Sequence, residues 1–462
     1  MPQATRRWIS EKVKSLRESN VLPFHDILSA SMVKEALTAE GVTFKERLYT
    51  PLVTLCVFLS QVLDPDHSCR AAVARLIVWL AISGRKPCAP DTGSYCDARQ
   101  RLPLGVIVRL VRQTARETEQ RATAAWRWNG RRVTLVDGST VSMPDTSENQ
   151  QAFPQMKAQG IGLGFPLVRI VVLIALATGV VRDLALGPYQ GKETGETALF
   201  RALWDTLERG EIVLGDRYFA SFFGIAGLSQ RGVDVLFRMH QRRKFDFRRG
   251  RRLGIADHVV TWTKPSRPEW MDEVTYGQMP EEVTVRELRI TVDQPGFRVN
   301  ELVLVTTLLD ASEYAKEEVA DLFLQRWNIE LDLRSIKDVL EMDVLRCKTP
   351  EMVEKEIWMH LLAYNLIRGV MASAAEAHDK PPRRLSFKGA LQTMTAFQEV
   401  LRHAAPGERD RLVQVMLKAI ASHQVGDRFG RAEPRANKRR PKPQRFLTEP
   451  RQEARKRLKQ AA

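Results

Sequence analysis

The spacing of apolar residues divides the chain into a helical beginning, a mixed middle and a helical end. In residues 53–62, 71–82 and 106–120, apolar side chains recur every three or four positions, a spacing that predicts amphipathic helices. From about residue 131, apolar residues instead form short runs, which are typical of buried strands. Helical spacing returns over residues 312–423. The pattern therefore predicts an α/β core flanked by helical N- and C-terminal regions.

The apolar runs in the middle of the chain come in a definite order. The first, residues 132–136, is a short strand-like run that leads into Asp137. Runs 165–177 and 180–187 are separated by Thr178-Gly179, which predicts a hairpin buried on both faces. The elements that follow are a helix at 194–209, a strand at 212–215 before Asp216, a helix at 219–231 and a strand at 233–239. This order predicts a mixed sheet of the ribonuclease-H-like kind.

Basic residues outnumber acidic ones, and the excess is concentrated at one end. The 462 residues include 71 Lys and Arg against 55 Asp and Glu, a net charge of +16. Residues 426–462 alone hold 13 basic and 4 acidic residues, a net charge of +9. An excess of this size favours a polyanionic partner, most often nucleic acid, and argues against an ordinary small-metabolite enzyme.

The cysteines and the longest apolar run indicate a soluble protein of a reducing compartment. Five scattered cysteines without a C-x-x-C pair predict neither a disulfide scaffold nor a structural zinc site. The longest apolar run, residues 170–181, is too short to cross a bilayer, and the first 25 residues lack the apolar segment of a signal peptide. We therefore expect a cytoplasmic protein without a membrane partner.

The predicted helix at 317–340 places charged residues at the margin of its apolar stripe. At about 100° per residue, Phe323, Arg326, Glu330 and Lys337 fall within one arc of about 60°. Two cations beside one carboxylate suit a site that binds phosphate and a divalent metal together. An ordinary salt-bridged helix explains the same spacing, because Arg326 and Glu330 are four residues apart.

Two further acids favour the metal- and phosphate-binding site over the ordinary salt-bridged helix. Asp137 and Asp216 each follow a predicted strand, and ligand sites of open α/β sheets lie at the carboxyl ends of strands. Together with Glu330 they form a plausible site for two Mg²⁺ (or Mn²⁺) ions, because such hard cations prefer carboxylate oxygens. Taken singly, either Asp is explained as well by a turn or a helix cap.

These residues resemble the signature of a known family. The four residues of the helical arc have the spacing of the Y-R-E-K motif of bacterial DDE transposases of the insertion-sequence-four family, with Phe323 in place of the usual Tyr. Segments 136–139 (Val-Asp-Gly-Ser) and 215–219 (Gly-Asp-Arg-Tyr-Phe) are similar to those that carry the family's first two catalytic acids. The resemblance covers most of the chain from about residue 25.

The resemblance implies a metal-dependent enzyme that acts on double-stranded DNA. Asp137, Asp216 and Glu330 would be catalytic and bind two metal ions, whereas Arg326 and Lys337 would hold the DNA backbone near the scissile phosphate. The implied reaction is cut-and-paste transposition. Water cuts one strand at the transposon end, the freed 3′-hydroxyl makes a hairpin with the opposite strand, and the reopened end joins target DNA. A homodimer on paired terminal inverted repeats, associated with the bacterial nucleoid, is also implied.

Further DNA contacts are expected between the second and third acids. In relatives, a Trp of this insertion holds a base that has left the stack, and both Trp262 and Trp270 are candidates here. Packing in a small β core explains either Trp equally well. Basic side chains of this region would contact the DNA backbone, although a solvated surface has the same composition. They include Arg242, Arg243, Lys244 and Arg248.

Five regions are predicted on these grounds. They are a helical N-terminal DNA-binding region (1–125), a ribonuclease-H-like catalytic core (126–239 and 313–372), a β-rich insertion (240–312), a helical C-terminal region (373–425) and a basic tail (426–462). Four prolines in the tail predict an extended chain there. Two other functions stay open: a metal-dependent endonuclease or resolvase that cuts without joining, and a catalytically silent DNA-binding regulator derived from a transposase.

Overall fold

A nine-stranded mixed sheet forms the centre of the molecule. The computed structural model describes residues 28–45, 47–82, 84–291, 301–426 and 446–460. The strands are β1 (Val133–Ser142), β2 (Leu167–Ala175), β3 (Val181–Pro188), β4 (Ile212–Gly215), β5 (Asp234–Arg238), β6 (Arg251–Gly254), β7 (Asp257–Thr263), β8 (Glu282–Thr291) and β9 (Glu301–Thr306). Their order across the sheet is β3-β2-β1-β4-β5-β9-β8-β7-β6.

The first five strands have the predicted ribonuclease-H-like arrangement. Strands β1, β2 and β3 are antiparallel neighbours, and β4 and β5 continue the sheet in parallel with β1. Short helices separate the later strands: α8 (Glu196–Arg201), which is followed by a 3₁₀ turn, and α9 (Phe222–Gln230). The predicted fold class is therefore confirmed, although the helix expected over residues 194–209 is shorter than predicted.

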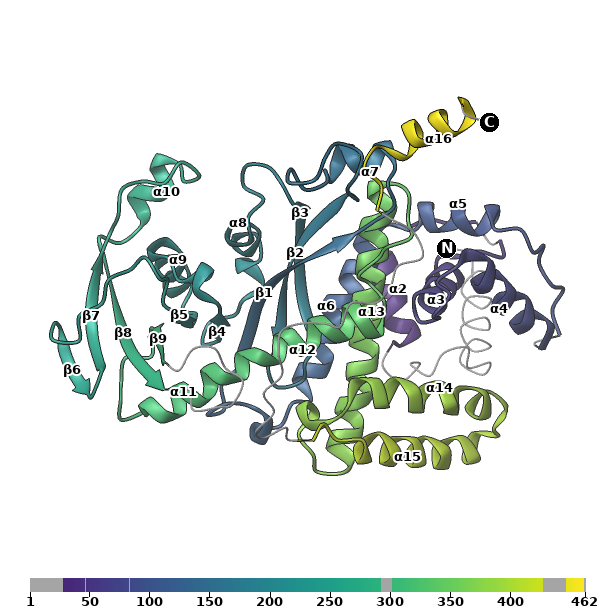
Figure 1. The fold of residues 1–462 in the computed structure, drawn as a ribbon. Helices are drawn as coiled ribbons and strands as arrows, with labels where there is room; N and C mark the ends of the chain where they lie inside the picture. The colour runs from purple at the N-terminus through teal and green to yellow at the C-terminus, as the bar shows by residue number, and fades with distance from the viewer. Residues whose placement is uncertain (1–27, 46, 83, 292–300, 427–445, 461–462) are drawn as a thin grey trace.

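The β-rich insertion continues the sheet of the core. Strand β9 pairs antiparallel with β5, and β8, β7 and β6 follow outward from it, as the left half of Figure 1 shows. A short helix, α10 (Glu273–Gln278), connects β7 to β8. The strands of the insertion and those of the core therefore belong to one continuous sheet, in which β9 lies next to β5 and β5 lies next to β4. Asp216 directly follows β4.

Helices cover the two faces of the sheet. The N-terminal helices are α2 (Ala30–Ala39), α3 (Pro51–Val62), α4 (Cys69–Ile82), α5 (Gly93–Arg101) and α6 (Leu104–Gln120), and the C-terminal ones are α13 (Pro350–Ala377), α14 (Phe387–His403), α15 (Pro406–Ser422) and α16 (Arg451–Gln460). Helices α6 and α13 lie side by side next to the sheet, and α3, α14 and α15 lie on the far side of α13 (Figure 1). No helix within the described ranges is long and apolar enough to cross a membrane.

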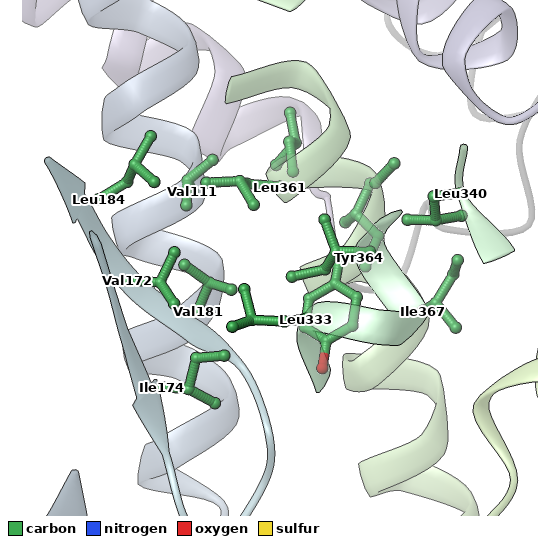
Figure 2. Packing of buried hydrophobic residues seen from close by; sticks show 14 of the residues in the cluster. Val111, Val172, Ile174, Val181, Leu184, Leu333, Leu340, Leu361, Tyr364 and Ile367 are labelled. Carbon is green, nitrogen blue, oxygen red and sulfur yellow. The ribbon is translucent and has the colours of Figure 1, made fainter. Parts of the chain in front are cut away.

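The main core joins one face of the sheet to α6, α12 (Asn328–Arg334) and α13. Figure 2 shows Val172 of β2 and Val181 of β3 facing Val111 of α6, with Leu361 of α13 close by. Helix α13 begins at Pro350, whose preceding Thr349 accepts a hydrogen bond from the Met352 amide, and it is buried along most of its length. A second cluster on the opposite face packs α8 and α9 against the sheet.

The segment that carries the predicted arc is one helical path with changes of pitch. It consists of α11 (Lys316–Leu324), a 3₁₀ turn η4 (Gln325–Trp327), α12 (Asn328–Arg334) and a π turn η5 (Ser335–Val339). The expectation of one regular helix is wrong, because the tighter and wider turns change the rotation per residue. The prediction of an extended C-terminal tail is also wrong for residues 451–460, which form α16. Residues 427–445 of the tail lie outside the described ranges.

Candidate active site

Asp137 and Asp216 occupy matching positions on neighbouring parallel strands. Leu135 of β1 pairs with Leu214 of β4, and each acid lies two residues further along the chain. Asp216 directly follows β4 as expected, whereas Asp137 lies inside β1 and not at its carboxyl end, because the strand continues to Ser142. The Gly138 amide donates a 2.8 Å hydrogen bond to Asp137 Oδ1, and the Arg217 amide donates a 2.7 Å bond to Asp216 Oδ1. Burial raises the pKa of Asp137, the negative charge of Asp216 adds to this, and the Gly138 amide and Arg326 oppose it. The two carboxyl groups are therefore close enough to interact electrostatically.

Arg326 lies between the strand acid and the helix acid. Its Nη1 is 3.8 Å from Asp137 Oδ2, and its Nη2 is 3.4 Å from Glu330 Oε1. The Arg326 side chain is 11% exposed, whereas Glu330 is 45% exposed. Arg326 and Glu330 lie together, as their spacing predicted. Asp137, which is 189 residues before Arg326 in the sequence, lies next to them because α12 packs on β1.

Lys337 reaches the same strand beyond Asp137. Its Nζ donates a 3.0 Å hydrogen bond to the Thr140 carbonyl and forms a 2.8 Å ion pair with Asp343. Phe323, by contrast, is 4% exposed and belongs to the main core. Its ring carries no hydroxyl group that would have to stay at the surface, which is consistent with its burial.

A fourth carboxylate, which the sequence analysis missed, approaches β1 from α8. A Cβ atom on Gly138 would lie only 2.5 Å from the carboxyl carbon of Glu196. Burial, and then the charges of Asp137 and Asp216, raise the pKa of Glu196. Gly138 itself was the available signal, because a glycine inside a strand often marks the close approach of another group.

The acids fit a divalent metal by the chemistry of their donor atoms. Asp137, Asp216 and Glu330 offer hard oxygen ligands, and two of them already share the Arg326 cation. Within the described ranges, no three His, Cys, Asp or Glu side chains are close enough together to hold one ion in this conformation.

The two Trp candidates of the insertion differ in their exposure. Trp262 is 5% exposed, donates a 2.8 Å hydrogen bond from Nε1 to Glu287, and has the Arg243 guanidinium 3.5 Å above its ring. Trp270 is 37% exposed, and the Arg201 guanidinium lies 3.7 Å from its ring centroid. Trp262 is therefore packed in the β core, whereas Trp270 is the more accessible ring.

The basic segment begins at the edge of this site. Arg217, next to Asp216, donates a 2.7 Å hydrogen bond from Nη1 to Gln241. Of the predicted contacts, Arg242 and Lys244 are exposed, Arg243 is half-buried on Trp262, and Arg248 is bound to Asp246. The segment that carries these cations is thus connected by the Arg217–Gln241 hydrogen bond to the residue next to the second acid.

The chain is similar to known transposases. The family model described as "Transposase DDE domain" matches residues 128–366, which contain all three acids. The chain is 30% identical over 424 residues to the transposase InsG for insertion sequence element IS4 of Escherichia coli (strain K12), a match that covers 90% of this chain and 91% of that protein. It is also 41% identical over 81 residues, 18% of this chain, to the putative transposase InsL for element IS186A, of which the match covers 21%.

Among solved structures, a piggyBac transposase in a synaptic complex with hairpin DNA aligns over 88% of this chain and 84% of that one, with a TM-score of 0.41 and 10% identity. The family match spans more than half of the chain, and InsG is similar over nearly its full length. The chain therefore belongs to the DDE transposases of the insertion-sequence-four family, DNA-cutting and strand-joining enzymes that depend on divalent metal.

Proposed function

We propose that this transposase moves an insertion sequence by a cut-and-paste reaction, with Asp137, Asp216 and Glu330 as its catalytic, metal-binding residues. The observation that best supports this assignment is the arrangement around Arg326, which brings acids from a strand and a helix to one cation. The proposed cofactor is Mg²⁺ or Mn²⁺, as two ions. When bound, such ions activate the attacking oxygen and stabilise the leaving oxygen of a phosphodiester.

The remaining residues of the site are proposed to position DNA. Arg326 and Lys337 flank the acids and would hold phosphate groups beside the scissile bond. The same acids would serve each step in turn: cleavage by water, attack of the freed 3′-hydroxyl on the opposite strand, reopening of the hairpin, and joining to target DNA. No covalent bond between protein and DNA is required.

The DNA is proposed to run from this site along the insertion. Arg242, Arg243, Lys244 and Arg248 would contact the backbone, and Trp270 would stack on a base turned out of the helix. Phe323 and Trp262 are buried, so the proposed DNA contacts do not include them. The substrates would be the terminal inverted repeats and target DNA, bound by a homodimer in the bacterial cytoplasm at the nucleoid.

A strand-transfer assay tests this function. The full-length protein is mixed with Mg²⁺, a labelled DNA carrying the element's end and a supercoiled target plasmid. Cleavage, a hairpin intermediate and joined products support cut-and-paste transposition. Cleavage without joining would instead indicate an endonuclease or resolvase, and binding without cleavage would indicate a regulator.

Replacing Trp270 with Ala should impair hairpin formation more than first-strand nicking. Stacking of a base on an aromatic ring contributes about 1–3 kcal/mol, so the rate of hairpin formation should fall roughly 5- to 150-fold. Single-turnover assays that resolve nicked, hairpin and open ends measure both steps. Trp270→Phe, which keeps a ring, should retain most of the hairpin rate. Equal losses of nicking and hairpin formation in Trp270→Ala would refute the stacking role.

A further inference from the structure

Glu196 occupies space that only a glycine at position 138 leaves open. A Cβ atom on Gly138 would lie 2.6 Å from Glu196 Oε1 and 2.5 Å from its carboxyl carbon, which is well inside van der Waals contact. Gly138 pairs with Val171 as an ordinary strand residue and has no positive φ. The backbone therefore does not require glycine here, and the lack of a side chain serves the close approach of Glu196 to the residue next to Asp137.

Packing of α8 holds Glu196 in this position. Leu199 and Phe200, on the same short helix, are buried in the second core cluster, and Leu199 lies against Gly187 of β3. The segment before the helix is tied to the sheet, because Arg169 of β2 donates a 2.7 Å hydrogen bond to the Thr194 carbonyl. Glu196 is thus presented by a packed element and not by a free loop.

The carboxylate of Glu196 has no protein group that neutralises it at bonding distance. Across the described ranges it makes no hydrogen bond or ion pair, although it is only partly exposed. Burial raises the pKa of Glu196, the negative charges of Asp137 and Asp216 raise it further, and the positive charge of Arg169 opposes them. Three acids near the paired strands β1 and β4 repel each other, and a bound cation would relieve this repulsion.

We infer that Glu196 is a positioning residue for the divalent cation bound by Asp137, Asp216 and Glu330. This inference rests on the proposed assignment of those three acids. Mg²⁺ keeps several water ligands when it binds to proteins, and such waters are hydrogen-bond donors for a carboxylate that lies outside direct contact with the ion. Glu196 would accept these hydrogen bonds on the α8 side of β1, whereas Glu330 approaches from α12.

Binding of Mn²⁺ alone, without DNA, tests the inference. Free Mn²⁺ is measured by electron paramagnetic resonance during titration of the full-length protein. Glu196→Gln should weaken Mn²⁺ binding by about 10- to 100-fold, as removal of an outer partner of a metal site does. Gly138→Ala should weaken it similarly, because the new methyl group displaces the carboxylate while leaving its charge. The double variant should bind Mn²⁺ no more weakly than the weaker single variant, since both changes disturb one interaction.

Controls separate this inference from the assignment of the site itself. Asp205, just beyond α8, is 94% exposed, so Asp205→Asn should leave Mn²⁺ binding unchanged. Asp137→Asn should abolish it. Weak binding in Asp137→Asn together with normal binding in Glu196→Gln would overturn the role of Glu196 and keep the site. Normal binding in both would overturn the site. Normal binding in Gly138→Ala but not in Glu196→Gln would show a long-range charge effect and refute the hydrogen-bonding role.

Discussion

Glu330→Gln is expected to abolish DNA cleavage while leaving DNA binding in place. The substitution keeps the shape of the side chain but removes the charge that a divalent cation requires. Metal ions contribute several kcal/mol to the stabilisation of such transition states, so the single-turnover cleavage rate should fall by about 10³-fold or more. The measurement is cleavage of end DNA with Mg²⁺, beside a gel-shift titration without divalent metal. Asp137→Asn and Asp216→Asn should behave in the same way.

The joining step gives this prediction a second readout. DNA that already carries a free 3′-hydroxyl bypasses cleavage, yet Glu330→Gln should still fail to join it to a target, because one site serves both steps. Asp338→Asn is the matched control, since Asp338 lies on the same helical path and is 61% exposed. Full activity of Glu330→Gln in either step would remove Glu330 from the catalytic set.

The strands of the core could be predicted because their sequence carries the signal locally. Runs of Val, Ile and Leu such as residues 170–174 are buried on both faces, and Thr178-Gly179 marks the turn between β2 and β3. The strand acids were visible for the same reason, because each follows such a run. Pairing of β5 with β9 was not predictable, since it depends on a contact across about 65 residues.

Much of the site depends on contacts between elements and so could not be read from the sequence. Helical spacing placed Arg326 beside Glu330, but only the packing of α12 on β1 shows that Arg326 also faces Asp137. The regular periodicity also hid the π turn that precedes Leu340. The sequence made Trp262 and Trp270 equal candidates for stacking on a base. Only the structure shows that Trp262 is buried and that Trp270 is exposed.

A buried ion cluster fixes the helix that carries Glu330. Asp332, two residues further on, has no exposed surface and accepts hydrogen bonds from Arg368, from Arg383 and from the Tyr364 hydroxyl at 3.0 Å. Arg383 also donates hydrogen bonds to the carbonyls of Ala175 and Leu176, at the end of β2, at 2.9 and 2.6 Å. The cluster therefore connects α12, α13 and the C-terminal region to the catalytic sheet.

Asp332→Ala should be among the most destabilising single substitutions in the chain. It leaves the guanidinium groups of Arg368 and Arg383 buried without an anion, a change that costs about 3–5 kcal/mol of the free energy of unfolding. Asp338→Ala is the control on the same path. It removes an exposed pair with Arg334 at 3.2 Å, and such pairs contribute about 0–1 kcal/mol.

Urea unfolding followed by circular dichroism measures the difference between these two variants. A lower midpoint for Asp332→Ala than for Asp338→Ala is expected, because the buried guanidinium groups lose their anionic partner whereas exposed charges are solvated by water. Arg383→Met should restore part of the stability of Asp332→Ala, since the double variant no longer buries that unpaired cation. Equal midpoints for the two Ala variants would mean that water reaches the cluster, and Glu330 would then lack the rigid support that the contacts of Asp332 imply.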